Sequence, residues 1–100
     1  MEHSANANGD ALELALSGKF TFADNKAFNR LIGDVPTYKK IIVDLAQVDF
    51  IDSAALGVLL LLRDKCEKSS TLLALKNPKG QVKQMFDISR FGDLFDIEHK

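Results

Sequence analysis

The pattern of hydrophobic residues changes from strand-like to helix-like at one place, within residues 39–68. Residues 41–45, Ile-Ile-Val-Asp-Leu, are apolar and largely β-branched, which predicts a central strand covered on both faces. Residues 54–68 contain one Gly and no Pro and are mostly strong helix formers, which predicts a helix. Asp52 and Ser53 lie between the two patterns, and both residue types suit the N-cap of that helix.

The expected helix has two apolar surfaces when its residues are placed about 100° apart. One is the core-facing stripe, formed by Ala55, Val58, Leu59, Leu62 and Cys66. The other lies on the outer side of the first turns, formed by Leu56, Gly57, Leu60 and Leu61, with Ser53 before them and Asp64 after them. A surface helix does not need this outer cluster, so it indicates either a protein-binding patch or contact with another element of the same domain.

The residues that precede the strand–helix region at 39–68 predict a hairpin and a helix. Residues 1–10 are polar and are expected to form a flexible tail, followed by one domain over residues 11–100. Residues 11–16 alternate between apolar and polar, which predicts a half-exposed strand, and Ser17-Gly18 is expected to turn it into a second, antiparallel strand. Thr21 is expected to cap the next helix, with an apolar face formed by Ala23, Ala27, Phe28, Leu31 and Ile32.

The residues that follow the strand–helix region at 39–68 predict two further strands and a third helix. Residues 71–75 and 94–97 have strand patterns, and Asn77-Pro78 is expected to start a helix between them. The core stripe of that helix would consist of Val82, Met85 and Phe86. Strands separated by helices predict an α/β fold with a mixed, mostly parallel sheet, an N-terminal antiparallel hairpin and helices packed against the sheet.

Composition narrows the possible partners and location. The chain has 100 residues and a net charge of −1, so no positive field favours nucleic acid or an anionic membrane. A single cysteine excludes an internal disulfide and is compatible with a reducing compartment. The longest apolar run, residues 54–62, is too short to insert across a bilayer. The sequence therefore favours a small cytoplasmic module.

The residue types of catalytic and metal sites do not come together in this sequence. His3 and His99 lie near the two ends, and Cys66 falls on the core stripe, so neither a Ser/His/Asp nor a Cys/His arrangement is expected. Asp44 and Asp49 lack the further ligands that a metal site needs. We therefore expect a protein that is not an enzyme and that has no cofactor or metal.

Residues 48–59, Val-Asp-Phe-Ile-Asp-Ser-Ala-Ala-Leu-Gly-Val-Leu, resemble the signature of the STAS domain, the fold of bacterial anti-sigma factor antagonists. In that family a strand leads into Asp-Ser at the start of a helix, followed by small residues and Leu-Gly. Residues 16–20 resemble the start of the family's second strand, and residues 82–89 resemble its last helix. The resemblance extends over residues 11–97 and implies a STAS-like fold.

The resemblance also implies a partner-switching mechanism in transcription regulation. The serine that matches Ser53 is phosphorylated by an anti-sigma factor that is also a serine kinase, and Asp52 flanks this phosphorylation site. The unphosphorylated antagonist binds that kinase and releases the sigma factor, and a phosphatase resets the phosphoprotein. The predicted partner-binding residues are those of the outer helix cluster, Leu56, Gly57, Leu60, Leu61 and Asp64, together with Thr21, which stands at a position that is acidic in many antagonists.

The expected position of Ser53 suits a binding switch. A phosphate adds about −1.5 to −2 charge, and the free amides and dipole of a helix N-terminus tolerate an anion. The same charge would lie beside Asp52 and before the outer leucines, where repulsion and desolvation oppose docking. We therefore expect phosphorylation to change binding rather than folding.

Two other interpretations use the same sequence. Ala54-Ala55 stands where Ser-Gly or Thr-Gly is more usual, which leaves open a STAS docking subunit of an ABC-type lipid transporter. Such a subunit would bind its ATPase through the same helix without phosphorylation. A receiver-like phosphoaspartate domain is disfavoured, because Leu16 is followed by Ser17-Gly18 rather than by an acidic pair.

Overall fold

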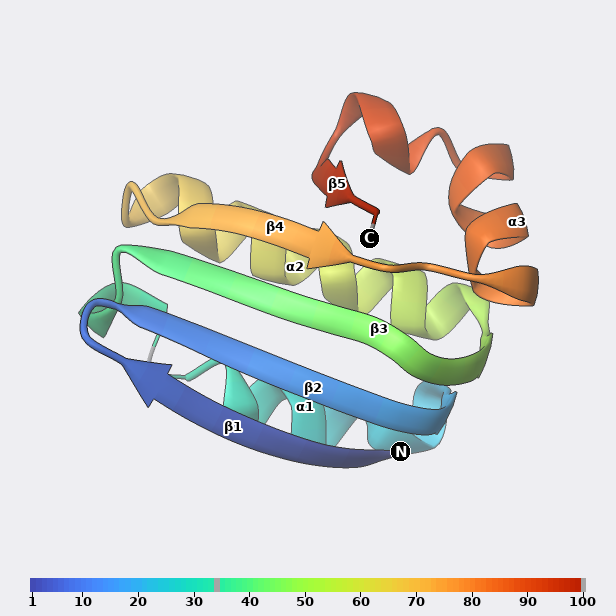
Figure 1. Cartoon of the computed structure of the whole chain (residues 1–100), viewed down its shortest axis with the longest axis horizontal. Helices are drawn as coiled ribbons and strands as arrows, with labels where there is room; N and C mark the ends of the chain where they lie inside the picture. The colour runs from blue at the N-terminus through green and yellow to red at the C-terminus, as the bar shows by residue number, and fades with distance from the viewer. Residues whose placement is uncertain (34, 100) are drawn as a thin grey trace.

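Five strands form a single sheet in chain order (Figure 1). The computed structural model describes residues 1–33 and 35–99, and its strands are β1 (Glu2–Asn8), β2 (Ala11–Phe20), β3 (Lys40–Ile51), β4 (Leu72–Lys76) and β5 (Asp96–Glu98). β1 pairs with β2 in antiparallel orientation, and all other neighbours are parallel. The predicted mixed, mostly parallel sheet with an N-terminal hairpin is therefore confirmed.

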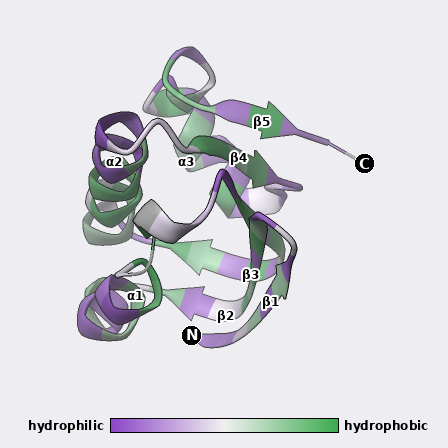
Figure 2. Cartoon of the chain, turned by 90° about the vertical axis from the view of Figure 1, so that its left-hand side faces the viewer, coloured by the Kyte–Doolittle hydropathy of each residue, from purple (hydrophilic) through white to green (hydrophobic). Residues whose placement is uncertain are grey.

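The helices connect the parallel strands and cover one face of the sheet. They are α1 (Asn25–Leu31), α2 (Ser53–Lys68) and α3 (Gly80–Ile88), with short 3-10 turns η1 (Phe22–Asp24), η2 (Val35–Thr37) and η3 (Phe91–Asp93). Each crossover moves to the next strand in the same direction, so right-handed connections bring the helices to the same face. Figures 1 and 2 show α1 and α2 together on that face.

The core lies between this face and the helices, and the alternation along β2 and β3 creates it. The inward residues Leu12, Leu14, Leu16, Ile41, Val43 and Leu45 are buried. Ile42 and Asp44, which alternate with them, are only half-buried. The prediction that β3 is covered on both faces is therefore wrong, because every crossover helix lies on the same side.

The N-terminal hairpin is one strand earlier than the sequence predicted. Residues 2–8, expected in the tail, form β1, and all seven are exposed. The turn occurs at Gly9-Asp10, where Gly9 has a φ of +63°, whereas Ser17 and Gly18 continue β2. A strand can pair through its backbone whatever its side chains, so polar residues 2–8 did not reveal β1. Their flexibility stays a prediction, as does the single domain over residues 11–100, the last of which lies outside the described part.

Several smaller boundaries also differ from the prediction. Phe28 and Ile32 face the core as expected, but Ala23 and Ala27 are exposed. The third helix begins at Gly80 rather than Pro78, because Asn77 has a φ of +61° and its amide bonds the Glu98 carbonyl beside β4. The last strand starts at residue 96 rather than 94, since η3 occupies the preceding turn.

The single cysteine is part of the core, as the helical stripe predicted. Cys66 is 2% exposed, and burial raises the pKa of its thiol from 9.0 to about 11. Burial thus keeps the thiol neutral in the folded chain at pH values where the unfolded chain would ionise. Cys66 ionises at a higher pH in the folded chain than in the unfolded chain. Its contribution to the free energy of unfolding is therefore fully present below about pH 9 and is lost as the pH rises towards about 11.

We predict that Cys66 does not react with a thiol-specific disulfide reagent at neutral pH in the folded chain. The reason is that the thiolate is both scarce and shielded from the reagent. The measurement is the absorbance of the released thiol, with and without guanidinium chloride. One equivalent should appear on unfolding only; equal rates in the two conditions would contradict burial of this thiol.

Candidate functional site

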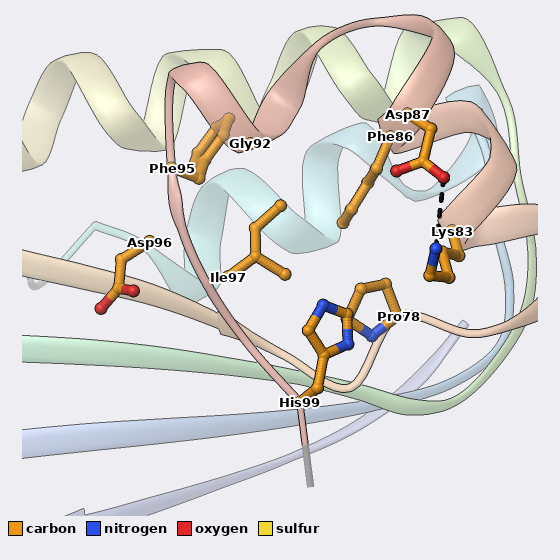
Figure 3. Close-up of a pocket in the computed structure, with 9 residues that line it drawn as sticks. All are labelled: Pro78, Lys83, Phe86, Asp87, Gly92, Phe95, Asp96, Ile97 and His99. Carbon is orange, nitrogen blue, oxygen red and sulfur yellow. Dashed lines mark hydrogen bonds and ion pairs between the residues drawn. The ribbon is translucent and has the colours of Figure 1, made fainter.

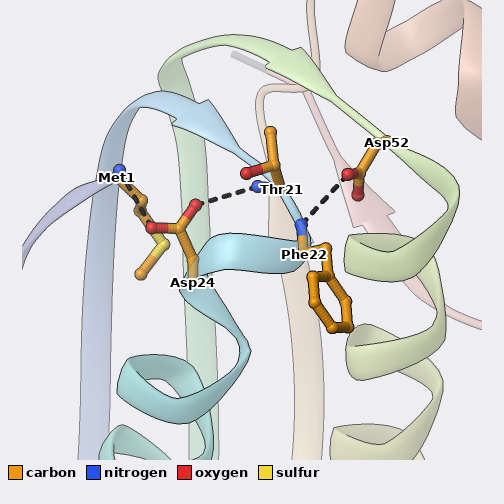
Figure 4. Close-up of polar contacts among 5 residues, drawn as sticks. All are labelled: Met1, Thr21, Phe22, Asp24 and Asp52. Carbon is orange, nitrogen blue, oxygen red and sulfur yellow. Dashed lines mark hydrogen bonds and ion pairs between the residues drawn. The ribbon is translucent and has the colours of Figure 1, made fainter.

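Asp52 joins three segments where β3 meets α2. It is the N-cap of α2, and its Oδ1 accepts the Ala55 amide at 2.9 Å. Its Oδ2 accepts the Phe22 amide at 3.0 Å, and its own amide donates to the Phe20 carbonyl at 3.3 Å. Figure 4 shows the bond between the Asp52 carboxylate and Phe22. One side chain therefore holds both the start of α2 and the connection that follows β2.

Ser53 is the first residue of α2 and not its cap. Its side chain is exposed, and within residues 1–33 and 35–99 its hydroxyl forms no hydrogen bond. Of the two N-cap candidates that the sequence offered, the structure selects Asp52. The Ser53 hydroxyl is thus available at the helix N-terminus, where free amides and the dipole favour a negative group.

The outer side of α2 carries an exposed surface, which we call the outer stripe. It consists of Ser53, Gly57, Leu60, Leu61 and Asp64, and Leu60 and Leu61 are 39% and 52% exposed. Leu56, predicted to face outward with them, is instead 7% exposed and belongs to the core. α1, η1 and η2 all pack against α2, so this helix is covered on more than its sheet-facing side.

The end of the outer stripe is polar. Asp64 Oδ2 forms an ion pair at 3.1 Å with Nζ of Lys68, one helical turn later. On the neighbouring side, Arg63 pairs with Glu67 at 3.0 Å, and its Nε donates to the Leu94 carbonyl at 2.6 Å. The apolar part of the stripe therefore lies between the Ser53 end and a charged last turn.

Thr21 has a structural role next to the site rather than a place on the outer stripe. It forms a capping box with Asp24, whose carboxylate accepts the Thr21 amide at 2.9 Å. The terminal ammonium of Met1 pairs with the same carboxylate at 3.1 Å (Figure 4). Partial burial raises the pKa of Asp24, but the Thr21 amide and the ammonium outweigh it, and the net pKa is lowered.

Three residues of this region were not among the predicted site residues. Phe22, at the start of η1, is 70% exposed, and Phe50, near the end of β3, is 39% exposed. Phe22 could have been found from sequence, because it falls outside the apolar face assigned to the helix that follows Thr21. The third, Gln81, had no such signal, since a glutamine in a helix is ordinary.

Gln81 holds the end of β3 by a two-bond side-chain contact. Its Oε1 accepts the Ile51 amide at 2.9 Å, and its Nε2 donates to the Ile51 carbonyl at 2.8 Å. The glutamine thereby pairs with the backbone as another strand would. Because Ile51 directly precedes Asp52, this contact between α3 and β3 also supports the start of α2.

A cleft of about 420 Å³ lies between α3 and the C-terminal segment (Figure 3). Phe86, Phe95 and Ile97 contribute apolar walls, and Lys83 pairs with Asp87 at 3.3 Å on its rim. None of the predicted site residues lines this cleft. In the described residues, no group of three His, Cys, Asp or Glu could hold a metal ion, and no helix is long and apolar enough to cross a membrane.

Known proteins resemble this chain in sequence and in fold. The STAS domain family model matches residues 3–100. A STAS-domain containing protein of Pseudomonas aeruginosa is 35% identical over 92 residues, 91% of each chain. A candidate anti-sigma factor antagonist of Thermotoga maritima has a TM-score of 0.89 at 21% identity, over 98% of this chain and 86% of that one.

The anti-sigma factor antagonist SpoIIAA of Bacillus has the same fold. Its unphosphorylated form has a TM-score of 0.78 at 17% identity, covering 96% of this chain and 86% of that one. Its phosphorylated form has a TM-score of 0.77 at 17% identity, covering 96% of this chain and 90% of that one.

We predict that Gln81→Ala destabilises the fold by about 1–3 kcal/mol, because it leaves two backbone groups of Ile51 without their partners. For a chain of this size, that corresponds to a fall in Tm of roughly 4–8 °C for each kcal/mol. Gln84→Ala on the exposed side of α3 is the matched control and should change stability by less than about 0.5 kcal/mol. Calorimetry that finds equal Tm values for the two variants would contradict the prediction.

Proposed function

The chain belongs to the STAS domain family, and we propose that it is a phosphorylation-regulated anti-sigma factor antagonist. In this proposal, the unphosphorylated chain binds an anti-sigma factor that is also a serine kinase and thereby releases the sigma factor. The kinase then phosphorylates Ser53, the complex dissociates, and a phosphatase restores the hydroxyl. The chain itself acts by binding and performs no catalysis.

The observation that carries this proposal is the position of the Ser53 hydroxyl. It is exposed at the start of α2, while the neighbouring Asp52 supplies the cap. Transfer from ATP would form a bond between Ser53 Oγ and the γ-phosphorus, release ADP and pass the hydroxyl proton to a base of the kinase. Since Ser53 has no part in capping, this reaction leaves the hydrogen bonds of Asp52 available to the fold. The existence of SpoIIAA structures in phosphorylated and unphosphorylated form is consistent with such a fold.

The residues of the outer stripe also support binding of a partner next to Ser53. Gly57 is exposed in the second turn of α2, and a Cβ added to it would meet no atom within 4 Å. Internal packing therefore does not require glycine here, although glycine in a helix costs about 1 kcal/mol relative to alanine. A partner backbone that approaches α2 closely between Ser53 and the exposed leucines gives this glycine a function.

Phosphorylation would act on this surface through charge. A phosphate on Ser53 adds about −1.5 to −2 charge next to the carboxylate of Asp52. Docking of the partner on Leu60 and Leu61 would then require desolvation of two neighbouring anionic groups, which is unfavourable without new cationic partners. The expected result is a large loss of affinity with little change in the fold.

We predict that the wild-type chain and Ser53→Ala capture a soluble anti-sigma factor/serine kinase from the organism that encodes the chain, whereas Ser53→Asp does not. Peptide mass spectrometry should find phosphate on Ser53 of the wild-type chain. Ser4→Asp, on exposed β1, is the control for added charge and should retain the kinase. If every bait retains a transporter ATPase and Ser53 is never modified, the chain is a docking subunit of an ABC-type lipid transporter instead.

We predict opposite effects of Gly57→Ala on stability and on binding. The variant should raise the stability of the fold by about 0.5–1 kcal/mol, because alanine favours the helix. It should weaken binding of the captured kinase by roughly tenfold, since the added methyl group separates the two surfaces. Gly92→Ala, at another exposed glycine with open space around it, is the control. Titration calorimetry that finds unchanged affinity for Gly57→Ala would exclude close approach at this position.

A further inference from the structure

Phe22 is an exposed aromatic residue on a fixed backbone. Its side chain is 70% exposed, but its amide donates to Asp52 Oδ2 at 3.0 Å. The preceding amide, of Thr21, donates to the Asp24 carboxylate at 2.9 Å, and Met1 holds that carboxylate from the other side. A ring presented from an ordered backbone loses little conformational freedom when a partner covers it.

The position of Phe22 brings it next to the proposed phosphorylation site. Its hydrogen-bond acceptor, Asp52, directly precedes Ser53, and Figure 4 shows the ring beside the first turns of α2. Any enzyme that transfers a phosphoryl group to Ser53 has to bring its own surface to the hydroxyl. The same surface therefore reaches Phe22, and the interface can continue to Leu60 and Leu61 on the outer stripe.

We propose that Phe22 is the aromatic anchor through which this chain binds the anti-sigma factor/serine kinase, and that Asp52 is the residue that positions it beside Ser53. This proposal rests on the proposed function above. The complementary surface of the kinase is an apolar pocket next to its phosphoryl-transfer site. Buried aromatic side chains are frequent among the few residues that supply most of the energy of an interface.

The two carboxylate oxygens of Asp52 allow positioning to be separated from capping. Asp52→Asn retains one acceptor oxygen, which can still cap α2 through the Ala55 amide. Its amide nitrogen cannot accept a hydrogen bond from the Phe22 amide. The variant should therefore keep α2 intact and release the backbone of Phe22.

The first test compares Phe22→Ala with Ile88→Ala, a matched control that removes a 79% exposed apolar side chain elsewhere on the surface. The full-length chains and the purified kinase captured by Ser53→Ala are the reagents. Phe22→Ala should raise the Kd roughly 10- to 100-fold, and Ile88→Ala should leave it within about twofold. Circular dichroism and Tm values establish that both variants remain folded.

The second test is a double-mutant cycle between the two residues. Asp52→Asn should raise the Kd in the wild-type background but have little further effect in the Phe22→Ala background, because the anchor that it positions is then absent. The Phe22 amide should also exchange faster with solvent in Asp52→Asn, as measured by NMR. Additive effects on the Kd, or unchanged exchange of this amide, would overturn the positioning role of Asp52.

A crosslinking experiment separates failure of the anchor from failure of the proposed function. The Phe22→benzoylphenylalanine variant, irradiated in cells of the organism that encodes the chain, should crosslink to the kinase. The Ile88→benzoylphenylalanine variant should not. If Ser53 is phosphorylated and the kinase binds, but position 22 does not crosslink and Phe22→Ala binds normally, the anchor is wrong and the proposed function stands. If Ser53 carries no phosphate and position 22 reaches no kinase, both proposals are wrong.

Discussion

The hydrogen bonds of one carboxylate determine the geometry of the proposed binding site. Asp52 accepts the Ala55 amide with one oxygen and the Phe22 amide with the other, so it couples the start of α2 to the connection after β2. An N-cap of this kind contributes about 1 kcal/mol to a helix. The bond to Phe22 also fixes the backbone of an exposed aromatic residue relative to Ser53. Gln81 holds the end of β3, the strand that directly precedes Asp52, and so supports both contacts.

The handedness of the crossovers explains why a binding surface remains available on α2. All three helices connect neighbouring parallel strands in the same direction, and right-handed connections place them on one face. On that face α2 has the sheet beneath it and α1 beside it, and both Leu59 and Leu56 are buried. The outer stripe of α2 stays uncovered, and Leu60 and Leu61 are exposed there.

The sequence predicted those parts of the molecule that a periodic pattern controls. The strand and helix periods gave the order of elements and the core stripe of α2, but left open whether Leu60 and Leu61 would be exposed. These periods could not reveal β1, whose pairing depends on its backbone, or the burial of Leu56, which depends on tertiary packing around α2. The bond between Asp52 and Phe22 joins residues 30 positions apart, and no local pattern indicates such a contact.

The division of roles between Asp52 and Ser53 has an energetic consequence for regulation. If Ser53 were the N-cap, a change to its hydroxyl would alter a bond worth about 1 kcal/mol to the helix. Because Asp52 supplies that bond, modification of Ser53 leaves the cap in place. The added charge then acts mainly on whatever approaches the outer stripe, since an anion at a helix N-terminus is otherwise favourable. A fold that separates these two roles can have its affinity for a partner changed greatly while its stability changes little.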